Sequence, residues 1–222
     1  MIRHVSFDFD GVLAQGSNEA YIDSYHRAML KVGIDMDGEL ERQRIFERWG
    51  RPVEEQIELL LLEHPDKRAE ARIFFNQDRQ SPAFRAQVSL FQGAEATIRL
   101  LSQQHTLSIV SGANRGLIES VLGPELKKLF ASIHSAADYA PHLQKPSPHM
   151  LEQAMKDSQV DPHETVYLGD APNDLRMAIA AGVEPIAILT GHLTRATAAK
   201  LGARHIIEDI TEFPEVITSL SR

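Results

Sequence analysis

The sequence predicts an α/β fold: a mostly parallel sheet with helices on both faces, into which an all-helical segment is inserted. Three features of the 222-residue chain lead to this prediction. An alternating apolar run stands at the start of the chain. A long stretch without strand-like patterns follows. From about residue 89 onward, strand-like runs alternate with amphipathic helices to the end of the chain.

The first strand is predicted within residues 1–10, where Val5, Phe7 and Phe9 alternate with polar residues. Residues 15–88 contain no comparable run and show helical patterns instead. Pro52 suits the first position of a helix, and two glutamates follow it in the first turn. The helices predicted in this segment cover 19–32, 38–48, 53–63 and 66–80.

The remaining elements alternate, and this indicates parallel strands joined by right-handed helical crossovers. The strands are predicted at 106–111, 131–135, 165–169, 185–190 and 204–207. The helices are predicted at 94–104, 115–122, 148–157, 173–181, 194–201 and 212–220. The first strand belongs with this set. We therefore expect a discontinuous Rossmann-like core domain, 1–14 and 89–222, and a helical cap domain, 15–88.

Composition narrows the possible functions. The net charge is -8, from 23 basic and 31 acidic residues, and no cluster of Lys or Arg offsets it, so we expect no nucleic-acid partner. The absence of cysteine excludes disulfides, thiolate zinc sites and cysteine nucleophiles. No apolar run approaches the ~20 residues of a membrane helix. The first strand leaves no room for a signal peptide, so we expect a cytoplasmic protein. The oligomeric state stays open.

Polar residues collect where the predicted strands end. Asp8 and Asp10 follow the first strand, Ser111 and Gly112 the second, and the segment Gly169-Asp170 the fourth, with Asp174 four residues further on. Lys145 lies in the loop after the third strand. The carboxyl ends of parallel strands form the ligand-binding edge of an open sheet, so we expect these side chains to meet there.

Each of these residue types has a use in phosphoryl transfer. Carboxylates hold Mg²⁺, and one carboxylate can attack phosphorus while another moves the proton of the leaving alcohol. A lysine, a hydroxyl and a backbone N–H can bind the phosphoryl oxygens. Taken singly, Asp170 is equally typical of a helix N-cap, Lys145 of a surface lysine and Ser111 of a turn. Their shared order and position favour a site.

With these residues, the chain resembles the haloacid dehalogenase superfamily in its branch with a helical cap after the first motif. The first motif is the run Asp8-Phe9-Asp10-Gly11-Val12-Leu13, the second is Ser111, the third is the run Lys145-Pro146-Ser147-Pro148, and the fourth is the run from Gly169-Asp170 to Asp174. The resemblance covers nearly the whole chain.

The resemblance implies a role for each motif residue. Asp8 is expected to be the nucleophile and a Mg²⁺ ligand, and Asp10 the general acid and base and a ligand through its carbonyl. Asp170 is expected to complete the protein ligands and Asp174 to support or share the metal site. Ser111, Gly112 and Lys145 are expected to bind the phosphoryl group. Relatives that cleave C–Cl or C–P bonds lack an acid at the position of Asp10, so an Asp there favours P–O cleavage.

Three functional hypotheses follow. The leading one is a phosphatase of a small phosphorylated metabolite, resembling the phosphoglycolate phosphatases. A sugar phosphomutase of the β-phosphoglucomutase type would use the same residues. A non-catalytic metabolite-binding module is disfavoured because Asp8, Asp10 and Lys145 are all present. In the cap, Arg51 is a candidate for binding a second anionic group, although an arginine beside a helix start is more often a surface residue.

Overall fold

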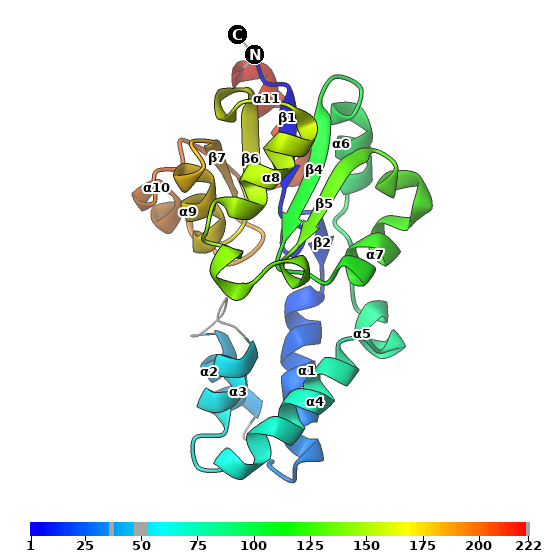
Figure 1. Cartoon of the computed structure of the whole chain (residues 1–222), viewed down its shortest axis with the longest axis vertical. Coiled ribbons are helices and arrows are strands. Elements are labelled where there is room, and N and C mark those ends of the chain that lie inside the picture. Colours follow the sequence, from blue (N-terminus) through cyan, green and yellow to red (C-terminus); the bar gives the residue numbers. More distant parts are fainter. Residues whose placement is uncertain (36–37, 47–52, 221–222) are drawn as a thin grey trace. The chain divides into compact units, whose positions relative to one another are not determined.

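The computed structural model describes residues 1–35, 38–46 and 53–220 (Figure 1). The chain divides into two compact units, Met1–Gln15 together with Ser89–Arg222, and Gly16–Val88. We refer to the first as the core unit and to the second as the helical unit, and each is described by itself.

The core unit is built on a six-stranded sheet whose strands are parallel throughout. In the order β5-β4-β1-β6-β7-β8, they are Phe130–Ser135, Thr106–Ser111, His4–Phe7, Thr165–Gly169, Glu184–Ile188 and His205–Ile207. This confirms the predicted parallel sheet. From β1 the chain builds outward on one side through β4 and β5, then crosses to the other side at β6. The carboxyl ends of β4 and β6 therefore flank that of β1, at the point where the strand order reverses.

Helices cover both faces of the sheet, as predicted (Figure 1). On one face, Val110 and Tyr167 pack with residues of α8 (His149–Ser158) and α9 (Pro172–Ala180). On the other face, Phe7 makes edge-to-face contacts with Phe130 and with Phe213 of α11 (Phe213–Leu220). The helices α6 (Ala94–Leu101) and α7 (Arg115–Lys127) complete this second layer, and α10 (Arg195–Lys200) packs on α9 and β8. These aromatic and aliphatic side chains form the hydrophobic core on the two faces of the sheet.

Besides its short 3₁₀ helices, two features of the core unit were not predicted. The helix α7 continues past the predicted end at residue 122, with a non-helical backbone at Gly123 (φ 66°, ψ 172°) and Pro124 after it. Proline has no N–H to satisfy, so it can begin the second helical stretch without loss of a hydrogen bond. The second feature is an antiparallel ribbon of two residues each, β2 (Ala14–Gln15) and β3 (Ser89–Leu90). The chain leaves and re-enters the core unit through this ribbon.

The helical unit contains α1 (Ser17–Lys31), α2 (Gly38–Phe46), α3 (Val53–Leu60), α4 (Arg68–Asp78) and α5 (Pro82–Ala86). Its core is a buried cluster that includes Tyr25, Met29 and Phe75. The short α5 was not predicted. Its N-cap is Ser81, whose side chain accepts a hydrogen bond from the N–H of Phe84. Among the described helices, none is long and apolar enough to cross a membrane.

Candidate active site

Asp8 follows β1 directly and stays tied to the sheet, because its N–H donates to the carbonyl of Leu168 at 2.9 Å. Its Oδ1 accepts a hydrogen bond from the N–H of Phe9 at 2.7 Å. The chain then turns sharply at Gly11, which has a φ of +72°, and the N–H of Gly11 donates to the carbonyl of Ala14. The turn begins at Asp10, which is half-buried. The first motif thus places two carboxylates at the carboxyl end of the central strand.

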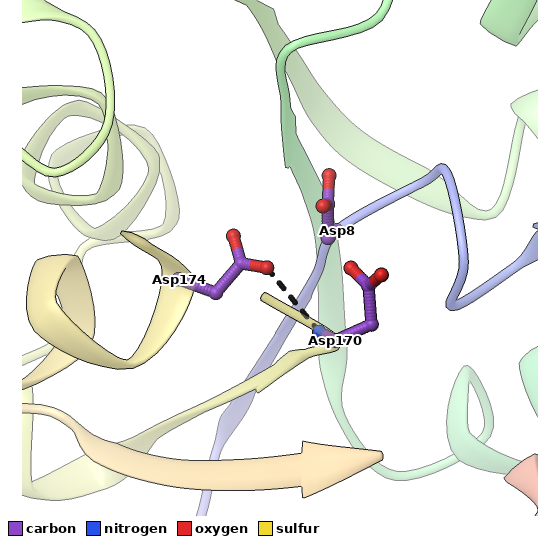
Figure 2. Close-up of side chains that lie close together, drawn as sticks. All are labelled: Asp8, Asp170 and Asp174. Carbon is purple, nitrogen blue, oxygen red and sulfur yellow. Dashed lines mark hydrogen bonds between the residues drawn. The ribbon is translucent and has the colours of Figure 1, made fainter. Parts of the chain in front are cut away.

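Asp8, Asp170 and Asp174 are brought together at this edge (Figure 2). One carboxylate oxygen from each lies within 4.8 Å of the others, and all three residues are buried. The Oδ2 of Asp174 accepts hydrogen bonds from the N–H groups of Asp170, at 3.2 Å, and Ala171, at 3.0 Å. These bonds satisfy N–H groups at the start of α9, so Asp174 also acts as a helix cap.

Lys145 inserts its ammonium between two of these carboxylates. Its Nζ lies 2.7 Å from Asp174 Oδ1 and 2.9 Å from Asp8 Oδ1. It also lies 5.4 Å from the ring centroid of Tyr167, within the range of a cation–π contact. The hydroxyl of Tyr167 lies 2.8 Å from the carbonyl of Val110 and 3.3 Å from Asp174 Oδ1. One lysine therefore joins the loop after β5 to the end of β1 and to the first turn of α9.

Ser111 ends β4 and is buried beside the nucleophile candidate. Its Oγ accepts a hydrogen bond from the N–H of Ala113 at 3.1 Å. Gly112 is exposed, and a Cβ added to it would meet no other atom within 4 Å. A ligand can therefore approach the backbone at Gly112. Arg51 lies outside the described residues.

The cluster of Asp8, Asp170 and Asp174 has three carboxylates against, among the described residues, the single ammonium of Lys145 that contacts it, so negative charge is in excess. Burial, followed by the charges of Asp174 and Asp8, raises the pKa of Asp170 well above its usual range. Burial also raises the pKa of Asp8, although Lys145 opposes the rise. Burial disfavours the charge of Lys145, but the charges of Asp174 and Asp8 outweigh it and raise the pKa of the ammonium. A group of buried carboxylates with this excess charge is suited to hold a metal ion.

Comparison with known proteins agrees with this geometry. The sequence profile described as haloacid dehalogenase-like hydrolase matches residues 5–188. The chain belongs to this family. The resemblance expected from the four motifs is thereby confirmed.

Individual relatives of this haloacid dehalogenase-like hydrolase are distant in sequence. The plasmid-encoded phosphoglycolate phosphatase of Cupriavidus necator is 28% identical over 131 residues, which are 59% of this chain and 56% of that protein. The chain thus spans little more than half the length of the curated relative that it matches.

Two solved structures illustrate the shared fold. A candidate haloacid dehalogenase-like hydrolase of Bacteroides fragilis has a TM-score of 0.82 at 23% identity, over 96% of this chain and 100% of that one. A candidate β-phosphoglucomutase of Thermotoga maritima has a TM-score of 0.75 at 18% identity, over 98% and 99%. At these identities the likeness shows the fold alone.

Sequence reasoning missed two parts of the site. Tyr167 lies on a strand that was correctly predicted, but its place beneath Lys145 and Asp174 follows from the fold. The segment Thr190–His192 comes after β7, and it contacts both Gly11 and Asp170. Its position at the carboxyl end of a predicted parallel strand, 185–190, was a signal that could have found it.

Proposed function

We propose that this haloacid dehalogenase-like hydrolase is a Mg²⁺-dependent phosphatase that hydrolyses a small phosphorylated metabolite through an aspartyl-phosphate on Asp8. The observation that carries the proposal is the buried contact of Asp8 with Lys145, beside Asp170 and Asp174. Family membership and the partial likeness to a phosphoglycolate phosphatase support it.

The proposed reaction has two steps. In the first, a carboxylate oxygen of Asp8 forms a bond to phosphorus while the bond from phosphorus to the leaving oxygen breaks, and Asp10 gives its proton to that oxygen. In the second, Asp10 takes a proton from water, whose oxygen attacks phosphorus and releases inorganic phosphate and Asp8.

Asp8, Asp170 and the carbonyl of Asp10 are the proposed ligands of Mg²⁺. Their all-oxygen donor set and the excess negative charge at the site suit this hard cation. Bound Mg²⁺ supplies positive charge that offsets the repulsion between Asp8 and an anionic phosphate. Both oxygens of Asp174 accept hydrogen bonds, so we assign it to orienting Lys145 and the start of α9 rather than to direct ligation.

Lys145, Ser111 and the N–H of Gly112 are the proposed partners of the phosphoryl oxygens, whose charge they would stabilise. Residues 15–88 are proposed to be a cap domain inserted into the core domain of 1–14 and 89–222, supplying substrate contacts and excluding water. Arg51 remains the proposed contact for a second anionic group of the substrate.

The test is the release of inorganic phosphate from a panel of phosphoglycolate, sugar phosphates, nucleotides, pyrophosphate and p-nitrophenyl phosphate. Release should require Mg²⁺, disappear in EDTA, and disappear in Asp8→Asn. The matched control is Asp66→Asn, which neutralises an exposed carboxylate on the helical unit and should leave the rate unchanged. Full activity of Asp8→Asn would refute the mechanism. Transfer between sugar phosphates that needs a bisphosphate activator, with little phosphate released, would identify a phosphomutase instead.

A further inference from the structure

The segment Thr190–His192 connects two parts of the candidate site that are far apart in sequence. The hydroxyl of Thr190 donates to the carbonyl of Gly11, in the turn after Asp8. Two residues later, the N–H of His192 donates to the carbonyl of Asp170 at 3.0 Å. Both bonds bind main-chain oxygens, so the segment fixes the backbone on either side of the carboxylate cluster.

Between these two bonds stands Gly191, which makes room for a side chain of the cluster. A Cβ added to Gly191 would lie 2.5 Å from Asp170 Cγ, and closer still to Oδ2. A Cβ added to Gly11 would lie 2.7 Å from the same Cγ. The carboxylate of Asp170 thus occupies a slot between two glycines. A larger residue at either position would have to displace it.

The two glycines differ in a way that an experiment can use. Gly11 has a φ of +72°, so any other residue there would also strain the backbone. Gly191 is not among the glycines with positive φ, and its backbone accommodates any L-residue. The cost of a methyl group at Gly191 therefore falls on Asp170 and not on the backbone.

We propose that Thr190 and Gly191 are positioning residues of the metal site. Gly191 fixes the orientation of the Asp170 carboxylate by leaving a slot of its size. Thr190 holds the carbonyl of Gly11, one residue beyond the Asp10 carbonyl that is a proposed ligand, and so fixes the turn that presents this ligand. The inference rests on the proposed Mg²⁺ site. Neither residue need touch substrate; each acts through a group that binds the metal.

The first test is Mg²⁺ binding to Gly191→Ala, measured by isothermal titration calorimetry in the absence of substrate. We expect the Kd to rise about 10-fold or more, the range found when groups that orient metal ligands are removed. The Mg²⁺ concentration for half-maximal activity should rise in parallel, while kcat at saturating Mg²⁺ falls less. The matched control is Gly38→Ala, where a Cβ would meet no atom within 4 Å and φ is not positive. It should bind Mg²⁺ as the parent protein does.

A pair of variants at Thr190 gives an independent test. Thr190→Ser keeps the hydroxyl that donates to Gly11, and Thr190→Val keeps the shape but loses the donor. We expect Ser to bind Mg²⁺ as tightly as Thr, and Val to bind it about 10-fold more weakly. This comparison remains decisive if Gly191→Ala does not fold.

The outcomes separate the two proposals. If the parent protein itself does not bind Mg²⁺, the proposed function fails at its metal site. If the parent binds Mg²⁺ and both Gly191→Ala and Thr190→Val bind it equally well, the positioning inference is overturned while the proposed function stands. Equal losses in Thr190→Ser and Thr190→Val would also overturn it, because the hydroxyl would then be irrelevant.

Discussion

Replacing Asp170 by Asn should stabilise the protein in the absence of metal and should abolish the proposed Mg²⁺-dependent phosphatase activity. The carboxylate of Asp170 is buried with those of Asp8 and Asp174, and burial and these charges raise its pKa. At neutral pH its ionised form is therefore costly in the folded state. Asparagine has nearly the same shape without the charge, so it relieves the repulsion and leaves the packing unchanged.

The size of the effect follows from the distances. Two unit charges 4.8 Å apart interact by about 3.5 kcal/mol at an effective dielectric constant near 20. Asp170 is repelled by two such neighbours, and Lys145, bonded to both, offsets part of that repulsion. We therefore expect Asp170→Asn to raise the free energy of unfolding by about 1 to 3 kcal/mol, or the Tm by roughly 3 to 10 °C.

The assay is urea and thermal unfolding at pH 7.5 in EDTA, with Asp66→Asn as the control for loss of an exposed carboxylate. Adding Mg²⁺ should stabilise the parent but not Asp170→Asn. The raised carboxylate pKa makes the fold progressively less stable as the pH rises from 3.8, the ordinary value, to the raised pKa. The advantage of the variant should therefore shrink as the pH falls toward 3.8. A variant less stable than the parent at pH 7.5 in EDTA would refute the electrostatic reasoning.

Three further changes test other contacts. Lys145→Met leaves two buried carboxylates without their shared ammonium and should cost about 3 to 5 kcal/mol in urea unfolding in EDTA; unchanged stability would contradict the ion pairs described. Tyr167→Phe removes the hydroxyl that donates to the buried carbonyl of Val110. It should cost about 1 kcal/mol by the same assay, and equal stability would show that this bond does not contribute to stability. Burial, with a smaller contribution from the charge of His134, lowers the pKa of His4 to about 4, against 6.5 for an unburied histidine. The folded state therefore loses about 3 kcal/mol relative to the unfolded state as the pH falls from 6.5 toward 4, and His4→Gln should flatten this loss in unfolding curves measured across that range.

The sheet could be predicted because its signal is local. The runs at 106–111 and 165–169 are long enough to show strand character, and the carboxyl-end rule then gathers Asp8, Ser111 and Asp170 at one edge. The ribbon β2–β3 was not predicted because strands of two residues are too short to show an alternating pattern. The helix α5 was not predicted because its five residues hardly exceed one helical turn. Both elements depend on tertiary contacts.

The finer arrangement of the site could not be predicted from spacing. The four-residue interval between Asp170 and Asp174 indicates proximity, but the donors around Asp174 become visible only when the Lys145 loop and Tyr167 are in place. Gly191 is similar: a glycine after a strand has many ordinary causes, and the overlap of its would-be side chain with Asp170 is a property of the fold.

The ribbon β2–β3 also makes the chain modular. Ala14 pairs with Leu90 and Gln15 with Ser89, so the two points where the chain crosses the boundary of the core unit are hydrogen-bonded neighbours. An insertion whose ends meet in this way does not require any change in the strand pairing of the sheet, whatever its length or internal structure. Such a junction would allow the helical unit of one relative to replace that of another without changes to the core unit. Gln15 and Ser89 are therefore the natural graft points for building chimaeras.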